Sequence, residues 1–586
     1  MMKFAYRPSP ESLAQCYALL ASALFLVTGI LYLSFGFLPM IHHDFWRSYD
    51  VLLNHSWWQA ALLKFNGHSL FFPTLLWEAH LYLFHGSQAV LFFVGLALLL
   101  ATCALLIVPI WRDAGWSLTA KLAATLVLII GNFWMARAGM LESAPFSCAY
   151  SLTMASSLLA FLWLPEMSGS PHSRLAAFIV LGGGFFATFS LGSGLLVWPT
   201  LLLLGWGFRL PYRFLTLVTL AMIGTAIIYA LLPPHYLDQP MIDPHAWFAT
   251  GAAEEVGQFC RLLGAPVALA LSAWREGMLE SQAAQKYPFA LWGGVIGIAW
   301  AIAAVVPHLW RRDVAANRRA ALGLALVTFD FLVFVMIVLS RNQRNHEVPN
   351  EIIAPRYIFW STLFWAGLFI LGLDWGERHP RWRRLGLLVA LTIPILVWPE
   401  HTQKGLQWRR ARFSATAGEA MLITGVADPA KILFADQSQI DRVVPQLRAH
   451  RLDLFASGWQ DYVGQPLPRF FHGQEDLTEY RAEASVSRLL GSKDDRGPMR
   501  VNGAFSSKSV PSLMVIVDSR DTIAGIARSC PMINLMNRWL YHGQSPRRHL
   551  TGYILSYDPA LQYYLRAVGE RDCLSQIAIP ITSLPR

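Results

Sequence analysis

Long, uninterrupted apolar runs limit what this chain can fold into more than any other feature. A helix needs about 20 mostly apolar residues to cross a bilayer, and runs of this kind recur up to about residue 400. Only 14% of the 586 residues are charged, against about a quarter in globular chains, so much of the surface must face lipid. We therefore predict a polytopic α-helical membrane protein with about eleven transmembrane helices, near residues 14–37, 88–110, 121–138, 147–164, 175–191, 193–208, 213–233, 289–310, 320–340, 357–375 and 385–399.

The segment LLGAPVALALSAW at 262–274 is also apolar, but it is short and lies in a polar setting. We interpret it as a re-entrant or interfacial segment. Basic residues favour this interpretation, because a cytoplasmic N-terminus then places the arginine-rich loops at 311–319 and 378–384 in the cytoplasm. A full crossing at 262–274 would move both loops outside. The cations at 404–412, which follow the last run on the outer side, oppose the same rule.

Residues from about 39 to 87 form the predicted first outer loop. The stretch SWWQAALLKFNGHSLFFPTLLWEAHLYLF at 56–84 has helical apolar spacing that is rich in Trp and Phe, with breaks at Asn66-Gly67 and Pro73. Such spacing is typical of amphipathic helices that lie in the headgroup layer of a membrane. We therefore predict one or two interfacial helices in this loop.

The composition changes at about residue 401. The segment KGLQWRRARFSATAGEAM predicts a basic amphipathic helix on the membrane surface, and short helices follow it. Runs rich in β-branched and aromatic residues, separated by turn residues, then favour a small β-sandwich. The predicted organisation is a transmembrane domain over 1–400, a helical linker over 401–460, and a soluble, β-rich domain outside the cytoplasm over 461–586.

Several common kinds of functional site are absent. HEVPN at 346–350 lacks the second His of a zinc-protease motif, and the chain has neither a P-loop nor a GxSxG elbow. The net charge of +10 does not indicate nucleic acid, because many cations lie in short loops between apolar runs. No CxxC pair occurs; Cys530 and Cys573 could form a disulfide outside the cytoplasm or remain two free, buried thiols.

Asp44, in the stretch IHHDFWRSYD, is the most informative acid of the outer face. A carboxylate beside Trp46 at the end of a membrane span could have a raised pKa and act as a general base. It could also bind a metal or hold a hydroxyl group. The competing interpretation is that Asp44 caps a helix that starts in FWRSYDVLLNH.

Two further outer-face positions carry polar side chains. Asn66 and His68 could contact a phosphate or a sugar, or they could form a simple Asn-Gly turn beside an interfacial histidine. Arg137 lies with Glu142 at the outer end of the third span. An arginine at that depth is a functional candidate because its burial is costly, although an Arg137–Glu142 ion pair explains it equally well.

The loop at 341–357 adds Arg341 and the pair Arg356-Tyr357, which directly precedes an apolar run. A guanidinium at that depth matches a phosphate by bidentate contact. The alternative is an interfacial arginine that reaches to lipid headgroups. Together, an acid, a histidine and several arginines lie on one face near the bilayer surface. This set suits an enzyme that takes a group from a phosphate-linked lipid.

The pattern resembles the C-type (GT-C) membrane glycosyltransferases. Within that superfamily, it is similar to bacterial inner-membrane proteins with D-F-W and N-x-H in the first loop and R-Y before a late span. Here these motifs are Asp44-Phe45-Trp46, Asn66-Gly67-His68 and Arg356-Tyr357, and the shared layout covers about residues 1–400.

The resemblance implies transfer of a sugar from a polyprenyl-phosphate carrier to a cell-envelope glycan or lipid-linked acceptor, with inversion. It implies that Asp44 is the catalytic base and that Arg356, with Arg341, holds the lipid phosphate. Asn66 and His68 would line the donor or acceptor site. Asp44 has no acidic neighbour, since His43 precedes it and Phe45 follows it, so the resemblance leaves open whether a divalent metal is required. The alternatives are a flippase of lipid-linked saccharides, for which Asp330 is the clearest midplane group, and a surface-polysaccharide polymerase or ligase.

Overall fold

The chain divides into two compact units, each built from separate stretches of sequence. The helical unit comprises residues 1–34, 56–77 and 91–407, and the barrel unit comprises 35–55, 78–90 and 408–586. The computed structural model describes residues 9–582 except 43, 139–143, 168–172, 236–250, 277–282, 312–313, 342–348, 432–436, 472, 476–480, 490–495, 507–512, 531–546, 569–572 and 576–577.

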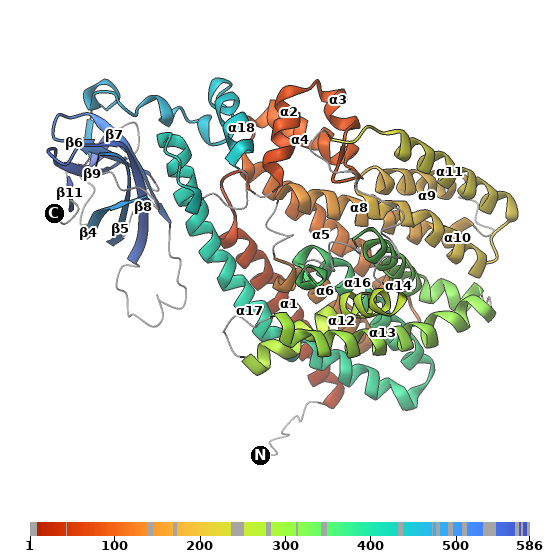
Figure 1. Ribbon diagram of the computed structural model, residues 1–586. Helices are drawn as coiled ribbons and strands as arrows, with labels where there is room; N and C mark the ends of the chain where they lie inside the picture. The colour runs from red at the N-terminus through yellow and green to blue at the C-terminus, as the bar shows by residue number, and fades with distance from the viewer. Residues whose placement is uncertain are drawn as a thin grey trace, which may run out of the picture. The chain divides into compact units, whose positions relative to one another are not determined.

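Long apolar helices confirm a multi-pass membrane protein (Figure 1). Ten helices of the described part are long and apolar enough to cross a membrane, against about eleven predicted. These are α1 (Pro10–Gly36), α5 (Gln88–Arg112), α6 (Leu118–Phe133), α8 (Ala144–Trp163), α11 (Tyr212–Leu231), α12 (Ala252–Glu276), α13 (Ala283–Arg311), α14 (Val314–Ser340), α16 (Pro355–Arg378) and α17 (Pro380–Thr424). Two predicted crossings are shorter helices, α9 (Ser173–Thr188) and α10 (Val197–Gly207), the latter preceded by the 3-10 helix Gly192–Leu196.

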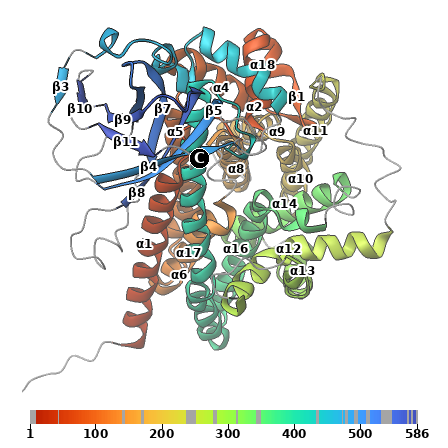
Figure 2. The same ribbon diagram turned by 60° about the vertical axis from the view of Figure 1, so that its left-hand side comes forward.

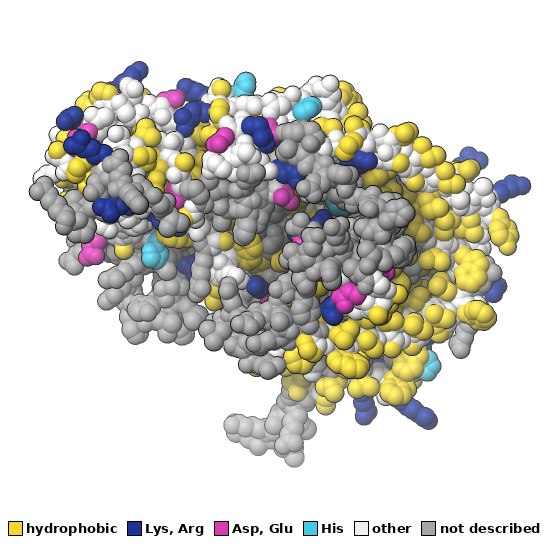
Figure 3. Space-filling model, viewed as in Figure 1, with side chains coloured by type: hydrophobic (Ala, Val, Ile, Leu, Met, Phe, Trp, Pro, Cys, Tyr) yellow, Lys and Arg dark blue, Asp and Glu magenta, His cyan; other side chains and the backbone are white. Residues whose placement is uncertain are grey.

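Apolar side chains cover the outside of this unit, and small residues pack inside it. Figure 3 shows hydrophobic side chains spread over α9 to α13, and Leu220, Ile227 and Leu231 of α11 are all exposed. Inside, Gly323 of α14 and Gly367 of α16 lie against each other's helices without room for a Cβ atom. Close approach at small residues is the usual way in which helices pack in lipid.

The segment 262–274 lies within α12, so it is part of a longer helix than the sequence suggested. It is also one of the ten candidate crossings, which the sequence did not lead us to expect. It packs along α13, where Gly264 lies against Ala290 and Gly294 without room for a Cβ atom. Ser361 Oγ of α16 donates to Leu262 O at 2.8 Å, and Trp274 Nε1 donates to Leu396 O of α17 at 3.0 Å.

The first loop contains three short helices and a hairpin: α2 (Phe45–Asn54), α3 (Trp57–Leu62), β1 (Lys64–Phe65), β2 (His68–Ser69) and α4 (Phe71–Phe84). Asn66 and Gly67, with φ values of 48° and 72°, form its two-residue turn, because both positions need a left-handed backbone. Pro73 lies in the first turn of α4, where proline is tolerated, so the predicted break there is wrong. Trp57 and Trp58 stack with centroids 4.0 Å apart and are about half exposed; their location in the headgroup layer stays a prediction.

The predicted surface helix after residue 401 is not a separate element. Instead, α17 continues from the last apolar run to Thr424 as one helix of 45 residues, with Pro394 and Pro399 inside it. The predicted division between a span and a basic helix is therefore wrong. Residues 408–424 of this helix belong to the barrel unit.

The C-terminal strands form a closed barrel, so the predicted sandwich is wrong. The order is β11-β4-β5-β8-β7-β6-β9, and β4, β5 and β8 lie side by side in Figures 1 and 2. Closure comes from β11, which pairs in parallel with β4 and antiparallel with β9. The bounds are β4 Arg481–Arg488, β5 Gly497–Ser506, β6 Leu513–Asp518, β7 Ile523–Cys530, β8 Arg547–Tyr557, β9 Tyr563–Ala567 and β11 Ile579–Thr582, with β3 Gly473–Glu475 and β10 Cys573–Ser575 as a separate pair.

Apolar side chains such as Val501, Ile516 and Leu565 fill the barrel. The neighbouring positions along the strands point outward and hold the barrel to α17. Arg528 of β7 pairs with Glu419 of α17, and Ile526 N donates to Thr424 Oγ1 at 3.4 Å. The barrel is thus packed against the C-terminal end of α17.

The side chain of Cys530 lies outside the described residues, so its proposed disulfide with Cys573 stays a prediction.

Candidate functional site

The C-terminal end of α6 places Arg137 inside the helical unit. The helix ends at Phe133, and the 3-10 helix Met135–Arg137 turns the chain back over that end. Arg137 Nη1 donates to Gly131 O at 2.5 Å, which satisfies one of the last carbonyls of α6. The guanidinium lies 4.2 Å from the ring centroid of Phe359. Arg137 is completely buried, and its Nε and Nη2 have no hydrogen-bond partner among the described residues.

Arg356 and Tyr357 lie in the first turn of α16, directly after Pro355. A cation at the N-terminus of a helix opposes the helix dipole, so it needs a nearby anion. Glu351, in the 3-10 helix Pro349–Ile353, supplies one by pairing with Arg356. The Arg356 guanidinium also lies 4.9 Å from the ring centroid of Tyr357.

Tyr150 of α8 connects these residues. Its ring lies 5.7 Å from the centroids of both Phe359 and Trp360, and the charges of Arg356 and Arg341 both act on its phenol. Arg137 contacts the other side of this aromatic group through Phe359. The helical unit therefore brings Arg137, Arg341, Arg356 and Tyr357 together around Tyr150; we call this set the arginine cluster. The predicted partner Glu142 lies outside the described residues.

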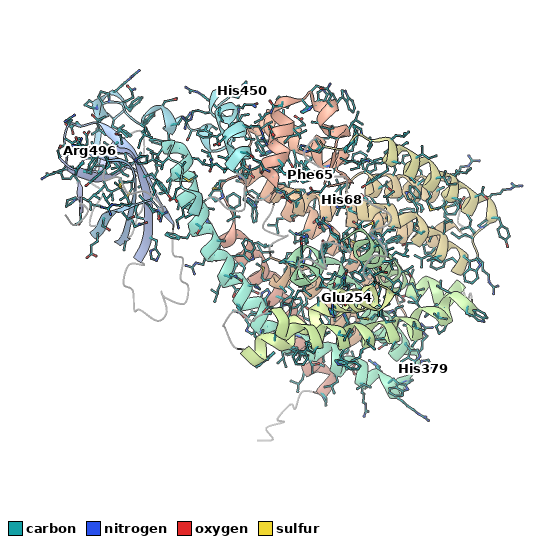
Figure 4. All side chains as sticks on the ribbon, viewed as in Figure 1. Phe65, His68, Glu254, His379, His450 and Arg496 are labelled. Carbon is teal, nitrogen blue, oxygen red and sulfur yellow. The ribbon has the colours of Figure 1, made fainter. Side chains whose placement is uncertain are left out.

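The hairpin with Asn66 and His68 contacts α8, and Figure 4 labels its residues Phe65 and His68. Phe65 lies 6.2 Å from Phe146, which is one helical turn before Tyr150. Tyr229 of α11 holds the turn, because its hydroxyl donates to Gly67 O at 3.0 Å and accepts from Ser69 N at 3.1 Å.

His68 packs against the backbone of the 3-10 helix that precedes α10. A Cβ atom on Gly192 would collide with its ring. The positive φ values of Asn66 and Gly67 confirm the Asn-Gly turn that the sequence allowed. Contacts of Asn66 and His68 with a substrate stay a prediction.

Asp44 lies in the barrel unit, at the position before α2. Its carbonyl accepts from Arg47 N at 3.1 Å, so it occupies the cap position that the alternative interpretation required. However, its carboxylate makes no capping hydrogen bond and the residue is exposed. The structure therefore shows an exposed carboxylate beside the buried Trp46. Phe45 and Trp46 are fully buried, so they do not anchor the loop in lipid.

Buried polar residues of the barrel unit were not singled out from the sequence. Burial raises the pKa of Glu78 to about 7 and that of Asp453 to about 8. Asp453 N donates to His85 O at 2.6 Å, and burial together with the Asp453 charge raises the pKa of Tyr49. Of these three residues, only Glu78 could have been recognised as buried from the sequence, because it lies within an apolar helical run.

A metal site was left open by the sequence. Within the described part of the chain, no group of three or more His, Cys, Asp or Glu residues could hold a metal ion.

Comparison with known proteins found no relative. No family model, no curated protein and no solved structure matches this chain. Residue chemistry and geometry are therefore the basis for a functional proposal.

Proposed function

We propose that this protein is an integral membrane glycosyltransferase of the C type, which moves a sugar from a polyprenyl-phosphate donor to a cell-envelope glycan. The observation that carries the proposal is the arginine cluster. Among the described residues, it gathers three guanidinium groups and one carboxylate, Glu351, which pairs with Arg356. Such an excess of positive charge suits a phosphate that is attached to a lipid tail.

The reaction assigned to these residues is an inverting substitution. The Asp44 carboxylate takes the proton of the acceptor hydroxyl, and the acceptor oxygen attacks the anomeric carbon. The bond between that carbon and the phosphate oxygen breaks, and the lipid phosphate leaves as an anion. Arg356 and Arg137 stabilise the negative charge that develops on this leaving group. Asn66 and His68 are assigned to sugar or acceptor contacts.

Replacement of Arg356 by methionine tests the phosphate site. Loss of one charge-assisted hydrogen bond of about 1.5–3 kcal/mol should lower sugar transfer about ten- to a hundredfold. The measurement is a mass profile of lipopolysaccharide and exopolysaccharide in a deletion strain that expresses each variant at equal level. Arg261→Met is the matched control, because Arg261 also pairs with a glutamate, Glu254, in α12. A normal profile for Arg356→Met would argue against the phosphate site.

The membrane topology proposed here has eleven crossings, an outer first loop and an outer barrel. The beginning and the end of the first loop lie in residues 35–55 and 78–90, which belong to the same compact unit as residues 408–586. These segments must therefore lie on one side of the membrane. This requires an even number of crossings between them. With α9 and α10 counted as crossings, the requirement is met if α12 does not cross the membrane. The same arrangement keeps the loops at 311–319 and 378–384 in the cytoplasm. The N-terminus is then cytoplasmic, and the barrel is periplasmic in a bacterial inner membrane.

Single cysteines in a cysteine-free variant test this topology. We expect Ala253→Cys and Ala456→Cys to react with a membrane-impermeant maleimide in intact cells, and Arg384→Cys to react only after lysis. All three positions are exposed. If α12 crosses the membrane in addition to α9 and α10, the pattern reverses for positions 384 and 456, which would overturn the proposed topology.

A flippase of lipid-linked saccharides is the second candidate, and Asp330 favours it. Asp330 lies inside α14, is fully buried, and has no hydrogen-bond partner for either carboxylate oxygen among the described residues. An intramembrane carboxylate of this kind often marks a transport path. A flippase deletion would accumulate the lipid-linked saccharide on the cytoplasmic side, whereas deletion of the transferase would leave the donor on the outer side.

A further inference from the structure

Helix α2, which follows Asp44, is held by other parts of the chain rather than by its own sequence. It has only ten residues, and a helix of that length is marginal in water. No side chain caps its N-terminus. Seven of its residues are nevertheless buried: Phe45, Trp46, Ser48, Tyr49, Asp50, Val51 and Leu52. Tertiary contacts must therefore set its position.

One set of contacts comes from α18 (Gln437–Ala449), which lies 392 residues later in the chain. Arg442 Nε donates to Asp50 Oδ2 at 3.1 Å, and Gln446 Nε2 donates to Asn54 Oδ1 at 3.0 Å. The two donor residues lie one helical turn apart on α18, and the two acceptor residues lie one helical turn apart on α2. Two such pairs in register prevent α2 from sliding or rotating along α18. Asn54 Nδ2 also donates to Asp50 Oδ1 at 2.9 Å, which links the two pairs.

A second set of contacts holds Tyr49. Its hydroxyl donates to Gly86 O at 3.3 Å and accepts from Gln88 Nε2 at 3.2 Å. Asp453, which follows α18, binds the neighbouring carbonyl of His85 through its N–H. The residues after α18 therefore also hold the chain segment against which α2 packs.

Helix α18 is itself fixed to the barrel through α17. Arg448 Nη2 donates to Leu422 O at 3.3 Å, near the end of α17. The same end carries Glu419, which pairs with Arg528 of the barrel. A continuous series of contacts thus runs from the barrel through α17 and α18 to α2.

We propose that the C-terminal region is the scaffold that positions Asp44, with Arg442 and Gln446 as positioning residues for the general base. This inference rests on the proposed function, because it assigns a catalytic task to Asp44. It explains why a membrane enzyme would carry a barrel whose interior is filled by apolar side chains.

The test compares Arg442→Met, Arg442→Lys and Gln446→Leu with the wild-type full-length protein in nanodiscs and in a deletion strain. Hydrogen exchange of residues 45–54 reports the order of α2 without any assumption about function. The glycan profile reports transfer. We expect Arg442→Met to speed exchange in α2 at least tenfold and to lower transfer at least tenfold, with exchange in the barrel unchanged. Gln446→Leu should show a smaller change in both, and Arg442→Lys should restore both because it keeps the charge.

Arg451→Met is the matched control, since Arg451 pairs with Asp461 at an exposed site of the same unit; it should leave both readouts unchanged. Unchanged exchange in α2 for Arg442→Met and Gln446→Leu would overturn the inference. Faster exchange in α2 together with normal sugar transfer would also overturn the inference. The activity of Asp44→Asn then shows whether the proposed function fails with it. If Asp44→Asn is inactive, only the positioning role fails; if it is active, the proposed function fails as well.

Discussion

Asp44→Asn is expected to abolish sugar transfer while the protein keeps its stability. A general base contributes about 10²–10⁴-fold to a rate, and asparagine cannot accept the proton. The carboxylate makes no capping hydrogen bond and is exposed, so its replacement should change the free energy of unfolding by no more than about 0.5 kcal/mol. The measurement is the glycan profile of strains with wild-type protein, no protein and Asp44→Asn, with protein levels checked.

Asp50→Asn is the contrasting variant for this experiment. Asp50 is buried and pairs with Arg442, so its replacement should loosen α2 and lower stability as well as transfer. If Asp44→Asn and the deletion lose the same sugar, that sugar identifies the donor. A wild-type profile for Asp44→Asn would remove the carboxylate from the mechanism and move the flippase ahead of the transferase.

Asp428→Ala is expected to release the barrel from α17. Asp428 is fully buried, and its Oδ2 accepts from Arg500 Nε at 2.9 Å and from Tyr553 Oη at 2.7 Å. Removal of one partner of a buried ion pair costs about 3–5 kcal/mol, because the remaining charge has no counter-charge. We expect unfolding of the barrel unit at lower temperature and faster proteolysis of residues after 424 in the full-length protein.

Asp461→Ala is the control for this loss of stability. Asp461 pairs with Arg451 at the surface, and an exposed pair contributes about 0–1 kcal/mol. Equal unfolding temperatures for the two variants would mean that the Asp428 contacts do not hold the barrel. A replacement of both Arg500 and Asp428 by apolar residues should recover part of the loss, since no unpaired charge then remains.

Features that depend on neighbouring residues were predictable. The apolar runs predicted the long helices, the Asn66-Gly67 pair allowed a turn, and the runs rich in β-branched and aromatic residues predicted strands β5 to β9. Each follows from local periodicity or backbone preference. The change in composition at about residue 401 misled the prediction for α17, because the helix continues through it to Thr424.

Most of the candidate site depends on distant residues. Arg137, Arg341, Arg356 and Tyr357 could be selected individually from their positions at the ends of apolar runs. Tyr150, which joins them, could not, because an aromatic residue inside an apolar run carries no signal of its own. Asp50, which is buried and pairs with Arg442 392 residues away, was not selected from the sequence either.

The sequence by itself determined that this protein crosses a membrane many times, which residues form most of its helices and strands, and which polar residues lie at helix ends. Hydrophobic periodicity and turn chemistry act over a few residues, so they can be recognised in the chain. Only the tertiary structure decided that the strands close into a barrel through β11, that α12 packs along α13, and that α18 holds α2. These outcomes depend on pairings between residues up to hundreds of positions apart, and the energy of such pairings has no local sequence signature.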